Sequence, residues 1–206
     1  MGLEENSLSG SIPNEIGKLT KLTSLGIRDN SLTGSIPRDL GQCSELTTLF
    51  LSSNFLYGSI PNQIGGLTKL TNLEIQENSL TGAIPSEIGQ FPDLMSLSLY
   101  ENSLRGSIPS EIGELTKLTY LGVHENYLTG TIPTEIGQCT ELTKLVLHSN
   151  SLHGSIPSET IALTKLESLF SYGNNLNGTM PESLCNHVDY LNACDIECTC
   201  CNSDNC

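Results

Sequence analysis

Hydrophobic and polar positions alternate along this chain in a pattern that repeats every 24 residues. In the unit at residues 115–138, Leu121 and Val123 are two apart, which is the side-chain period of a β-strand. Leu128 and Ile132 then return apolar side chains to the same interior after a turn. A supersecondary unit repeated at a fixed period of this length predicts a solenoid, in which each turn touches only its neighbours.

Two polar or rigid positions mark the register of every unit. An asparagine ends each predicted strand, and its amide is expected to bond main-chain groups that the turning backbone leaves unpaired. A proline fixes φ at the next corner, before a short helical turn. The asparagines are Asn6, Asn30, Asn54, Asn78, Asn102, Asn126, Asn150 and Asn174, and the prolines are Pro13, Pro37, Pro61, Pro85, Pro109, Pro133, Pro157 and Pro181.

Columns of equivalent apolar residues predict one continuous core, which a single unit could not enclose. The first strand column is Leu25, Leu49, Leu73, Leu97, Leu121, Leu145 and Leu169. The column before proline is Ile12, Ile36, Ile60, Ile84, Ile108, Ile132, Ile156 and Met180. Gly130 represents a further column, where glycine permits a tight or positive-φ bend.

The pattern LxxLxxLxLxxNxLxGxIPxxIGx resembles the plant-type leucine-rich repeat, from residue 3 to about residue 184. The resemblance implies an α/β solenoid: a right-handed coil of 24-residue units with a parallel sheet on its concave side. It also implies a second short sheet from segments such as 128–133. We therefore expect a solenoid of about eight units over residues 1–184, followed by a Cys-rich C-terminal cap over residues 185–206.

Charge and composition exclude several kinds of partner. The net charge of −14 argues against nucleic acid and anionic membrane surfaces, because both need clustered basic residues. Part of this charge has a structural origin, since carboxylates favour helix N-termini. They occupy one column, two residues after proline: Glu15, Asp39, Glu87, Glu111, Glu135 and Glu159.

The first residues read as the tail of a repeat, without the basic start and apolar stretch of a signal peptide. Solenoids usually need a terminal cap, so we expect an N-terminally truncated chain whose signal peptide lies upstream.

Function is expected where the units differ, on the exposed strand positions of the concave sheet. Aromatic and histidine side chains gather there in the C-terminal half, beside two glutamates. They can anchor a protein or peptide ligand, and their rings also suit a glycan. The alternative is that they merely pack along the sheet as cross-strand neighbours. The candidate ligand-binding residues are Tyr100, Glu101, Tyr120, His124, Glu125, His148, Phe170 and Tyr172.

Chemistry beyond binding finds little support in the sequence. His124 and His148 should lie about 4.8 Å apart, and with Glu101 or Glu125 they could hold a metal or sense pH. A flat strand surface offers no closed coordination sphere, so we expect no metal. Phosphate-binding and hydrolase motifs are absent from the sequence, so we expect no cofactor and no enzymatic activity.

The cysteines divide into two classes. Cys43 and Cys139 replace leucine in a core column and should be buried free thiols, too far apart for a disulfide. Six others crowd the predicted cap, where disulfides would stabilise a segment with little core, although a metal site is an alternative. They are Cys185, Cys194, Cys198, Cys200, Cys201 and Cys206.

Disulfides would place the chain in an extracellular or cell-surface setting, and Asn177 begins a glycosylation sequon.

The resemblance implies a non-enzymatic recognition module, like the ectodomains of receptor-like proteins and receptor kinases or the inhibitors of polygalacturonases. A second class is an ice-binding or surface-adsorbing protein, since the family has an antifreeze member. Its hydroxyl ladders would be Thr20, Thr68, Thr116, Thr140 and Thr164, and Thr23, Thr47, Thr71, Thr119 and Thr143. A third is a structural or adhesive stack that associates through its open apolar end.

Overall fold

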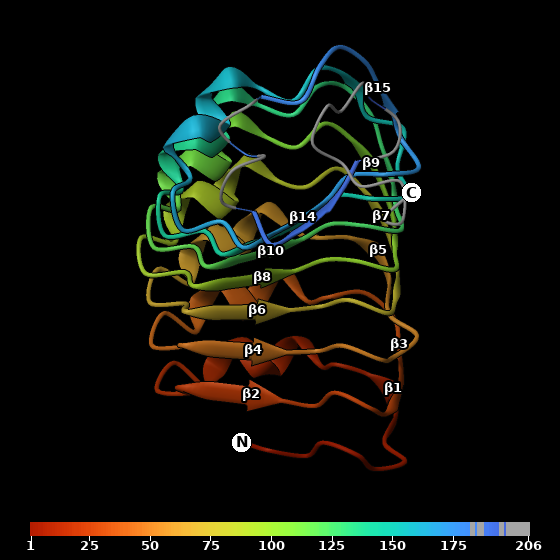
Figure 1. The fold of residues 1–206 in the computed structure, drawn as a ribbon. Coiled ribbons are helices and arrows are strands. Elements are labelled where there is room, and N and C mark those ends of the chain that lie inside the picture. The colour runs from red at the N-terminus through yellow and green to blue at the C-terminus, as the bar shows by residue number, and fades with distance from the viewer. Residues whose placement is uncertain (182–183, 185–187, 194–195, 197–206) are drawn as a thin grey trace.

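The computed structural model describes residues 1–181, 184, 188–193 and 196. The chain forms a stack of similar coils, with one parallel sheet running the length of the stack (Figure 1). Neighbouring strands pair at equivalent repeat positions, for example Leu121 with Leu145. The strands of this main sheet are β2 (Ser24–Gly26), β4 (Thr48–Phe50), β6 (Asn72–Glu74), β8 (Ser96–Ser98), β10 (Tyr120–Gly122), β12 (Lys144–Val146), β14 (Ser168–Phe170) and β16 (Tyr190–Asn192).

Short strands on a second side of the coil form the expected further pairing, in three pieces. The pairs and groups are β1 (Ser9–Ser11) with β3 (Ser31–Thr33); β5 (Tyr57–Ser59), β7 (Ser79–Gly82), β9 (Ser103–Gly106) and β11 (Tyr127–Leu128); and β13 (His153–Gly154) with β15 (Asn175–Leu176). The glycine predicted to bend this segment has positive φ, as Gly130 shows with φ of +79°. Glycine is therefore needed where the coil turns toward the proline.

A short 3₁₀-helix follows each of seven prolines and returns the chain to the main sheet. The helices are η1 (Asn14–Lys18), η2 (Arg38–Gln42), η3 (Asn62–Gly66), η4 (Ser86–Gln90), η5 (Ser110–Glu114), η6 (Thr134–Gln138) and η7 (Ser158–Ala162). Successive helices pack closely: a Cβ at Gly137 would meet the backbone oxygen of Glu159. Five residues are too few to cross a bilayer, and no helix of the described residues is long and apolar enough to do so.

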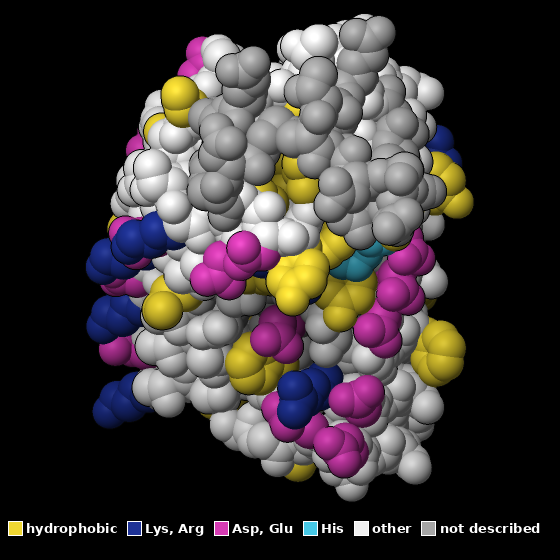
Figure 2. All heavy atoms as spheres, in the orientation of Figure 1, with side chains coloured by type: hydrophobic (Ala, Val, Ile, Leu, Met, Phe, Trp, Pro, Cys, Tyr) yellow, Lys and Arg dark blue, Asp and Glu magenta, His cyan; other side chains and the backbone are white. Residues whose placement is uncertain are grey.

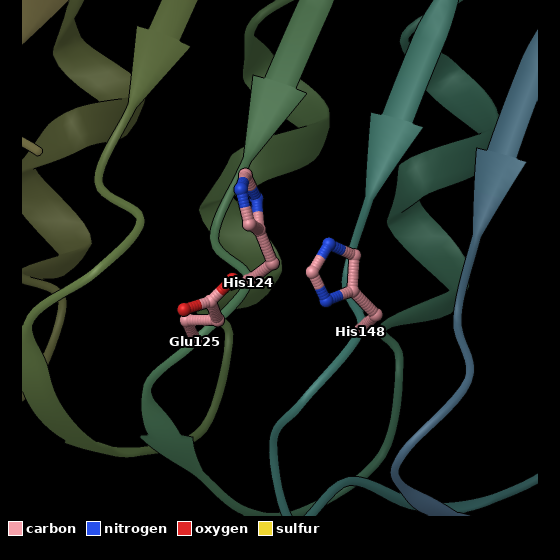
Figure 3. Close-up of side chains that lie close together, drawn as sticks. All are labelled: His124, Glu125 and His148. Carbon is pink, nitrogen blue, oxygen red and sulfur yellow. The ribbon is translucent and has the colours of Figure 1, made fainter.

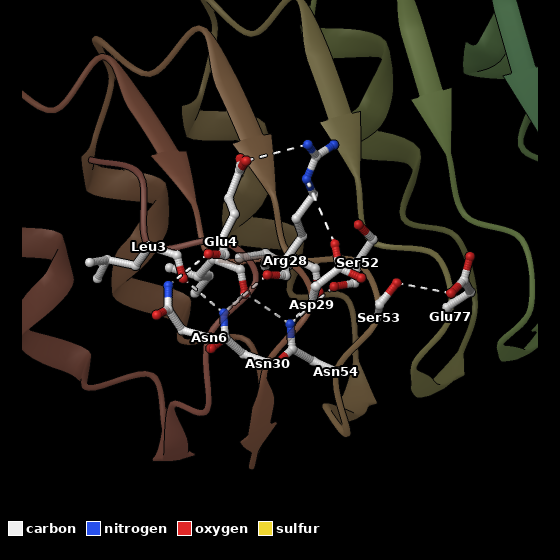
Figure 4. A network of polar contacts seen from close by, with 12 residues as sticks. Leu3, Glu4, Asn6, Arg28, Asp29, Asn30, Ser52, Ser53, Asn54 and Glu77 are labelled. Carbon is white, nitrogen blue, oxygen red and sulfur yellow. Dashed lines mark hydrogen bonds and ion pairs between the residues drawn. The ribbon is translucent and has the colours of Figure 1, made fainter.

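The predicted asparagine ladder is confirmed. The Asn54 amide donates to the backbone oxygens of Ile27, Leu51 and Ser52 at 3.0–3.2 Å, and its Oδ1 accepts from Leu32 N–H at 3.0 Å. The same pattern recurs from Asn30 to Asn174, and Figure 4 shows its first members side by side. The ladder satisfies backbone groups that neither sheet pairs, which explains why every unit ends its strand with asparagine.

The core columns are buried as predicted, and they form one cluster along the stack. Cys43 and Cys139 are free, fully buried thiols. Burial raises the pKa of Cys139 to about 12, which keeps this thiol neutral and unreactive. At the N-terminal end, where the first coil has a neighbour on one side only, Leu19 of the same column is 46% exposed.

The main sheet continues into the segment expected to form the cap. Strand β16 pairs with β14, so that Leu191 lies beside Leu169, a spacing of 22 residues in place of 24. The six predicted cap cysteines lie outside the described residues, and their pairing stays a prediction. The repeat period thus fails here while the sheet goes on.

Candidate functional site

Four aromatic rings stack across successive coils on the main sheet. They belong to Tyr100, His124, His148 and Tyr172, which occupy the same position two residues after strands β8, β10, β12 and β14. Their centroids are separated by 4.4, 4.5 and 4.5 Å in that order. Parallel pairing at equivalent positions sets this spacing, which is close to the ~4.8 Å between strands. The register alone therefore brings these predicted residues together.

A second row of side chains lies beside the ring stack. Lys144 Nζ sits 5.9 Å from the ring centroids of both Tyr120 and Phe170, in cation–π geometry. The Tyr120 ring crosses Gly122, where a Cβ would collide with the tyrosine hydroxyl group. Glycine thus leaves the space into which Tyr120 folds.

These two rows line a single hollow on the main sheet. Its lining residues are Tyr100, Tyr120, His124, Lys144, Val146, His148, Phe170 and Tyr172. Figure 2 shows hydrophobic side chains and a histidine gathered over the middle of this face. Lys144 and Val146 were absent from the predicted set. Lys144 could have been found, because its column in the repeat also holds Tyr120.

Glutamates form a row next to the ring stack, one residue further along each coil. Glu77, Glu101 and Glu125 have φ values of 54°, 49° and 53°, in the left-handed region that non-glycine residues seldom occupy. Figure 2 shows acidic side chains beside the hydrophobic side chains and the histidine of this face. Burial, followed by repulsion from Glu125 and Glu77, raises the pKa of Glu101 above its ordinary value. The row therefore concentrates negative charge at the edge of the aromatic surface.

The histidines of the stack are held neutral near pH 7. Burial, with smaller effects from His148 and Lys144, lowers the pKa of His124 to about 4. Burial also lowers the pKa of His148, although the carboxylate of Glu125 opposes this effect. Burial, with smaller effects from Tyr100 and Glu74, raises the pKa of Tyr120 to about 12. The hollow therefore presents uncharged rings, with Lys144 as its cation.

The lowered pKa of His124 predicts that stability falls as the solution becomes acidic. In the unfolded chain this imidazole has its ordinary pKa of about 6.5, so below that pH the unfolded state binds more protons. The stabilising contribution is complete above pH ~6.5 and is lost as the pH falls toward about 4. Because the ring is only half-buried, we expect a loss on the order of 1 kcal/mol.

Urea denaturation between about pH 7 and about pH 4.5, with a metal chelator present, checks this expectation. His124→Phe should be less pH-sensitive than the parent chain, whereas His153→Phe, at an exposed position on β13, should match the parent. Identical pH profiles for the parent and His124→Phe would contradict the prediction.

In one of the two threonine ladders, four of the five threonines have their hydroxyl groups engaged within the protein. The hydroxyls of Thr47, Thr71 and Thr143 each donate to a backbone oxygen of the preceding coil at 2.9–3.0 Å. Thr119 does the same toward Met95 at 2.8 Å. Hydrogens committed to the backbone cannot order water as donors, which weighs against an ice-binding role for this ladder.

The sequon residue Asn177 is exposed and directly precedes Gly178, which has φ of +84°. Its backbone N–H donates to the Gly154 oxygen at 2.8 Å, so the turn is fixed while the side chain faces solvent. Glycosylation at this residue stays a prediction.

Comparisons with known proteins agree with this architecture. Family models described as leucine rich repeat match residues 21–43, 45–67 and 68–128, about half of the chain. A search of curated proteins finds no match. Among solved structures, the ectodomain of the Arabidopsis receptor kinase HAESA in complex with a peptide hormone ligand is 36% identical, with a TM-score of 0.91. That match covers 96% of this chain and 33% of the receptor chain.

Two further structures frame the functional alternatives. The plant peptide hormone receptor RGFR1, in complex with RGF2, is 37% identical over 94% of this chain and 31% of its own, with a TM-score of 0.88. A plant ice-binding protein is 26% identical over 97% of this chain and 83% of its own, with a TM-score of 0.61. This chain thus spans about a third of the length of the receptor chains that it matches.

The matched repeats agree with the asparagine ladder and the parallel sheet, and the similar structures include plant receptor ectodomains. This chain belongs to the leucine-rich repeat family and is of its plant type.

Proposed function

We propose that this chain is a non-enzymatic recognition module of an extracellular, receptor-like protein, and that it binds a peptide on the main sheet. The observation that carries the proposal is the hollow in which the ring stack and the Tyr120–Lys144–Phe170 row converge. Rigid rings with polar tips bury much area at little entropic cost, which is why tyrosine anchors many binding surfaces. The plant peptide hormone receptors among the similar structures support the same class of ligand.

The charges of the hollow indicate what such a peptide would carry. An apolar or aromatic side chain would stack on the neutral rings of His124 and His148. A basic side chain would face the Glu101–Glu125 row, where mutual repulsion among carboxylates favours an approaching cation. Because both rows run across the coils, the peptide would lie along the axis of the stack.

The extracellular setting rests on two supports. Similar structures include plant receptor ectodomains, and the six cysteines of the C-terminal segment suit an oxidising compartment.

Selection of peptides from a displayed random library, against the full chain, tests the proposal. Selected peptides should be enriched in aromatic and basic residues. Tyr172→Ala should weaken their binding by about tenfold or more, as truncation of an anchor residue does. Phe50→Ala, the matched control, removes a ring from the same sheet face on β4 and should leave the affinity unchanged.

Three outcomes would count against peptide binding at the hollow: no enrichment, equal losses in Tyr172→Ala and Phe50→Ala, or peptides unaffected by either variant. Thermal hysteresis of the same protein separates the ice-binding alternative. Growth inhibition of ice by both the parent and Tyr172→Ala would favour surface adsorption over peptide recognition.

A further inference from the structure

Two histidines and a glutamate converge in the middle of the ring stack. One ligand atom from each of His124, Glu125 and His148 lies within 4.8 Å of the others. Figure 3 shows His148 reaching from the neighbouring coil toward the other two side chains. The sequence predicts a flat strand surface without a closed coordination sphere at this point. The structure instead gives a compact three-residue cluster of nitrogen and oxygen donors.

Neighbouring rings are nearly parallel at both ends of the stack, whereas the planes of the two histidine rings are tilted against each other. Tyr100 and His124 are inclined by 13°, and His148 and Tyr172 by 6°, whereas the two histidines are inclined by 38°. Each imidazole is stacked on an outer tyrosine, Tyr100 or Tyr172, and this contact fixes the position of its ring. Because of this tilt, the planes of the two imidazoles differ, and their nitrogens do not face in parallel directions.

One nitrogen of this pair lacks a partner. The Nδ1 atom of His124 is buried and accepts or donates no hydrogen bond among the described residues. Leaving such an atom unpaired costs free energy, which a bound ligand would recover. The Nδ1 atom of His148 lies 3.1 Å from Ser149 Oγ, a contact that orients the ring in the way second-shell partners orient metal ligands.

We propose that His124, His148 and Glu125 bind a divalent transition-metal ion of the zinc type. Two imidazoles and one carboxylate are a donor set that zinc uses in proteins, with a further coordination position left for water or a ligand group. The side chains must approach one another, since tetrahedral zinc at ~2.05 Å from nitrogen requires ligand atoms ~3.3 Å apart.

The cluster shares His124 and His148 with the hollow proposed to bind a peptide, but metal binding needs no peptide, so it is tested with the metal alone. Isothermal titration calorimetry of the full chain with zinc chloride should show a binding event that depends on this cluster. His124→Phe and His148→Phe keep a ring in the stack but remove both ring nitrogens. Because loss of an outer-shell partner alone costs about 10- to 100-fold, loss of a direct ligand should weaken this event by about 100-fold or more. Glu125→Gln should weaken it by about tenfold. His153→Phe, on β13, should bind as the parent does.

Cysteines elsewhere in the chain can also bind zinc, so the nature of the ligands is checked with cobalt(II). At the proposed site, cobalt should give visible bands of nitrogen and oxygen ligation that disappear in His148→Phe. Circular dichroism checks that the variants fold. If a phenylalanine variant does not fold, the proposal is tested by the zinc affinity of Glu125→Gln and by the cobalt spectrum of the parent. The proposal is overturned if the parent binds no zinc, if the cluster variants bind like the parent, or if His153→Phe loses as much affinity.

Discussion

Replacing Phe91 with alanine is expected to lower the free energy of unfolding by about 4 kcal/mol. Phe91 is fully buried and is the largest such side chain in the core. It occupies a column that elsewhere holds leucine or cysteine, immediately after η4. Its truncation leaves a cavity between coils that are fixed by their hydrogen bonds, so the surroundings cannot collapse to fill it. Urea denaturation followed by far-ultraviolet circular dichroism measures the loss.

The chain offers a matched control and a graded variant. Phe55→Ala makes the same change at a side chain that is 61% exposed, and it should alter stability by no more than about 0.5 kcal/mol. Phe91→Leu restores the residue of the neighbouring coils and should cost only about 1 kcal/mol. Similar losses for Phe91→Ala and Phe55→Ala would show that the core is not packed as described.

Replacing Asn126 with alanine is expected to cost about 3 kcal/mol, although the change removes only a few atoms. The Asn126 side chain is 7% exposed and makes four hydrogen bonds to the backbone. It donates to the oxygens of Leu99, Val123 and His124 at 3.1–3.2 Å, and it accepts from Leu104 N–H at 2.9 Å. Alanine would leave these groups unpaired in the interior, where water cannot replace the amide.

Asn6 is the control, because it has the same place in the repeat but lies at the end of the ladder. It is exposed, and its amide donates to the Glu4 oxygen at 2.7 Å. Asn6→Ala should therefore cost less than about 1 kcal/mol in the same denaturation experiment. Because each coil touches only its neighbours, Asn126→Ala should also broaden the transition as the two halves of the stack uncouple. Equal stability of the two variants would refute the structural role of the ladder.

The pairing of coils was predictable in detail because one covalent period governs the whole chain. A residue 24 positions along occupies the equivalent place in the next coil, so the burial of Leu121 and the neighbours of Asn126 follow from counting. The same counting placed Tyr100, His124, His148 and Tyr172 in one column. Counting along the sequence does not give the rotamer of each side chain, and so it does not give the direction of each ring.

Several properties of the site depend on that direction. The sequence places Lys144 beside Tyr120, yet the cation–π contacts with Tyr120 and Phe170 require particular rotamers.

Left-handed backbone at Glu101 was not predicted, because glutamate gives no local signal for positive φ. The turn that follows the strand imposes this conformation on whichever residue stands there.

The sequence by itself therefore determined the leucine-rich repeat fold, the inside and outside of the coil, the buried thiols and the rows of rings and acids. Tertiary structure alone decided the 38° tilt of the histidine pair, the unpaired Nδ1 of His124 and the neutrality of both imidazoles. The physical reason is that the two kinds of property depend on different interactions. Register is carried along the backbone by a covalent repeat, whereas ring orientation and pKa depend on atoms that approach from neighbouring coils.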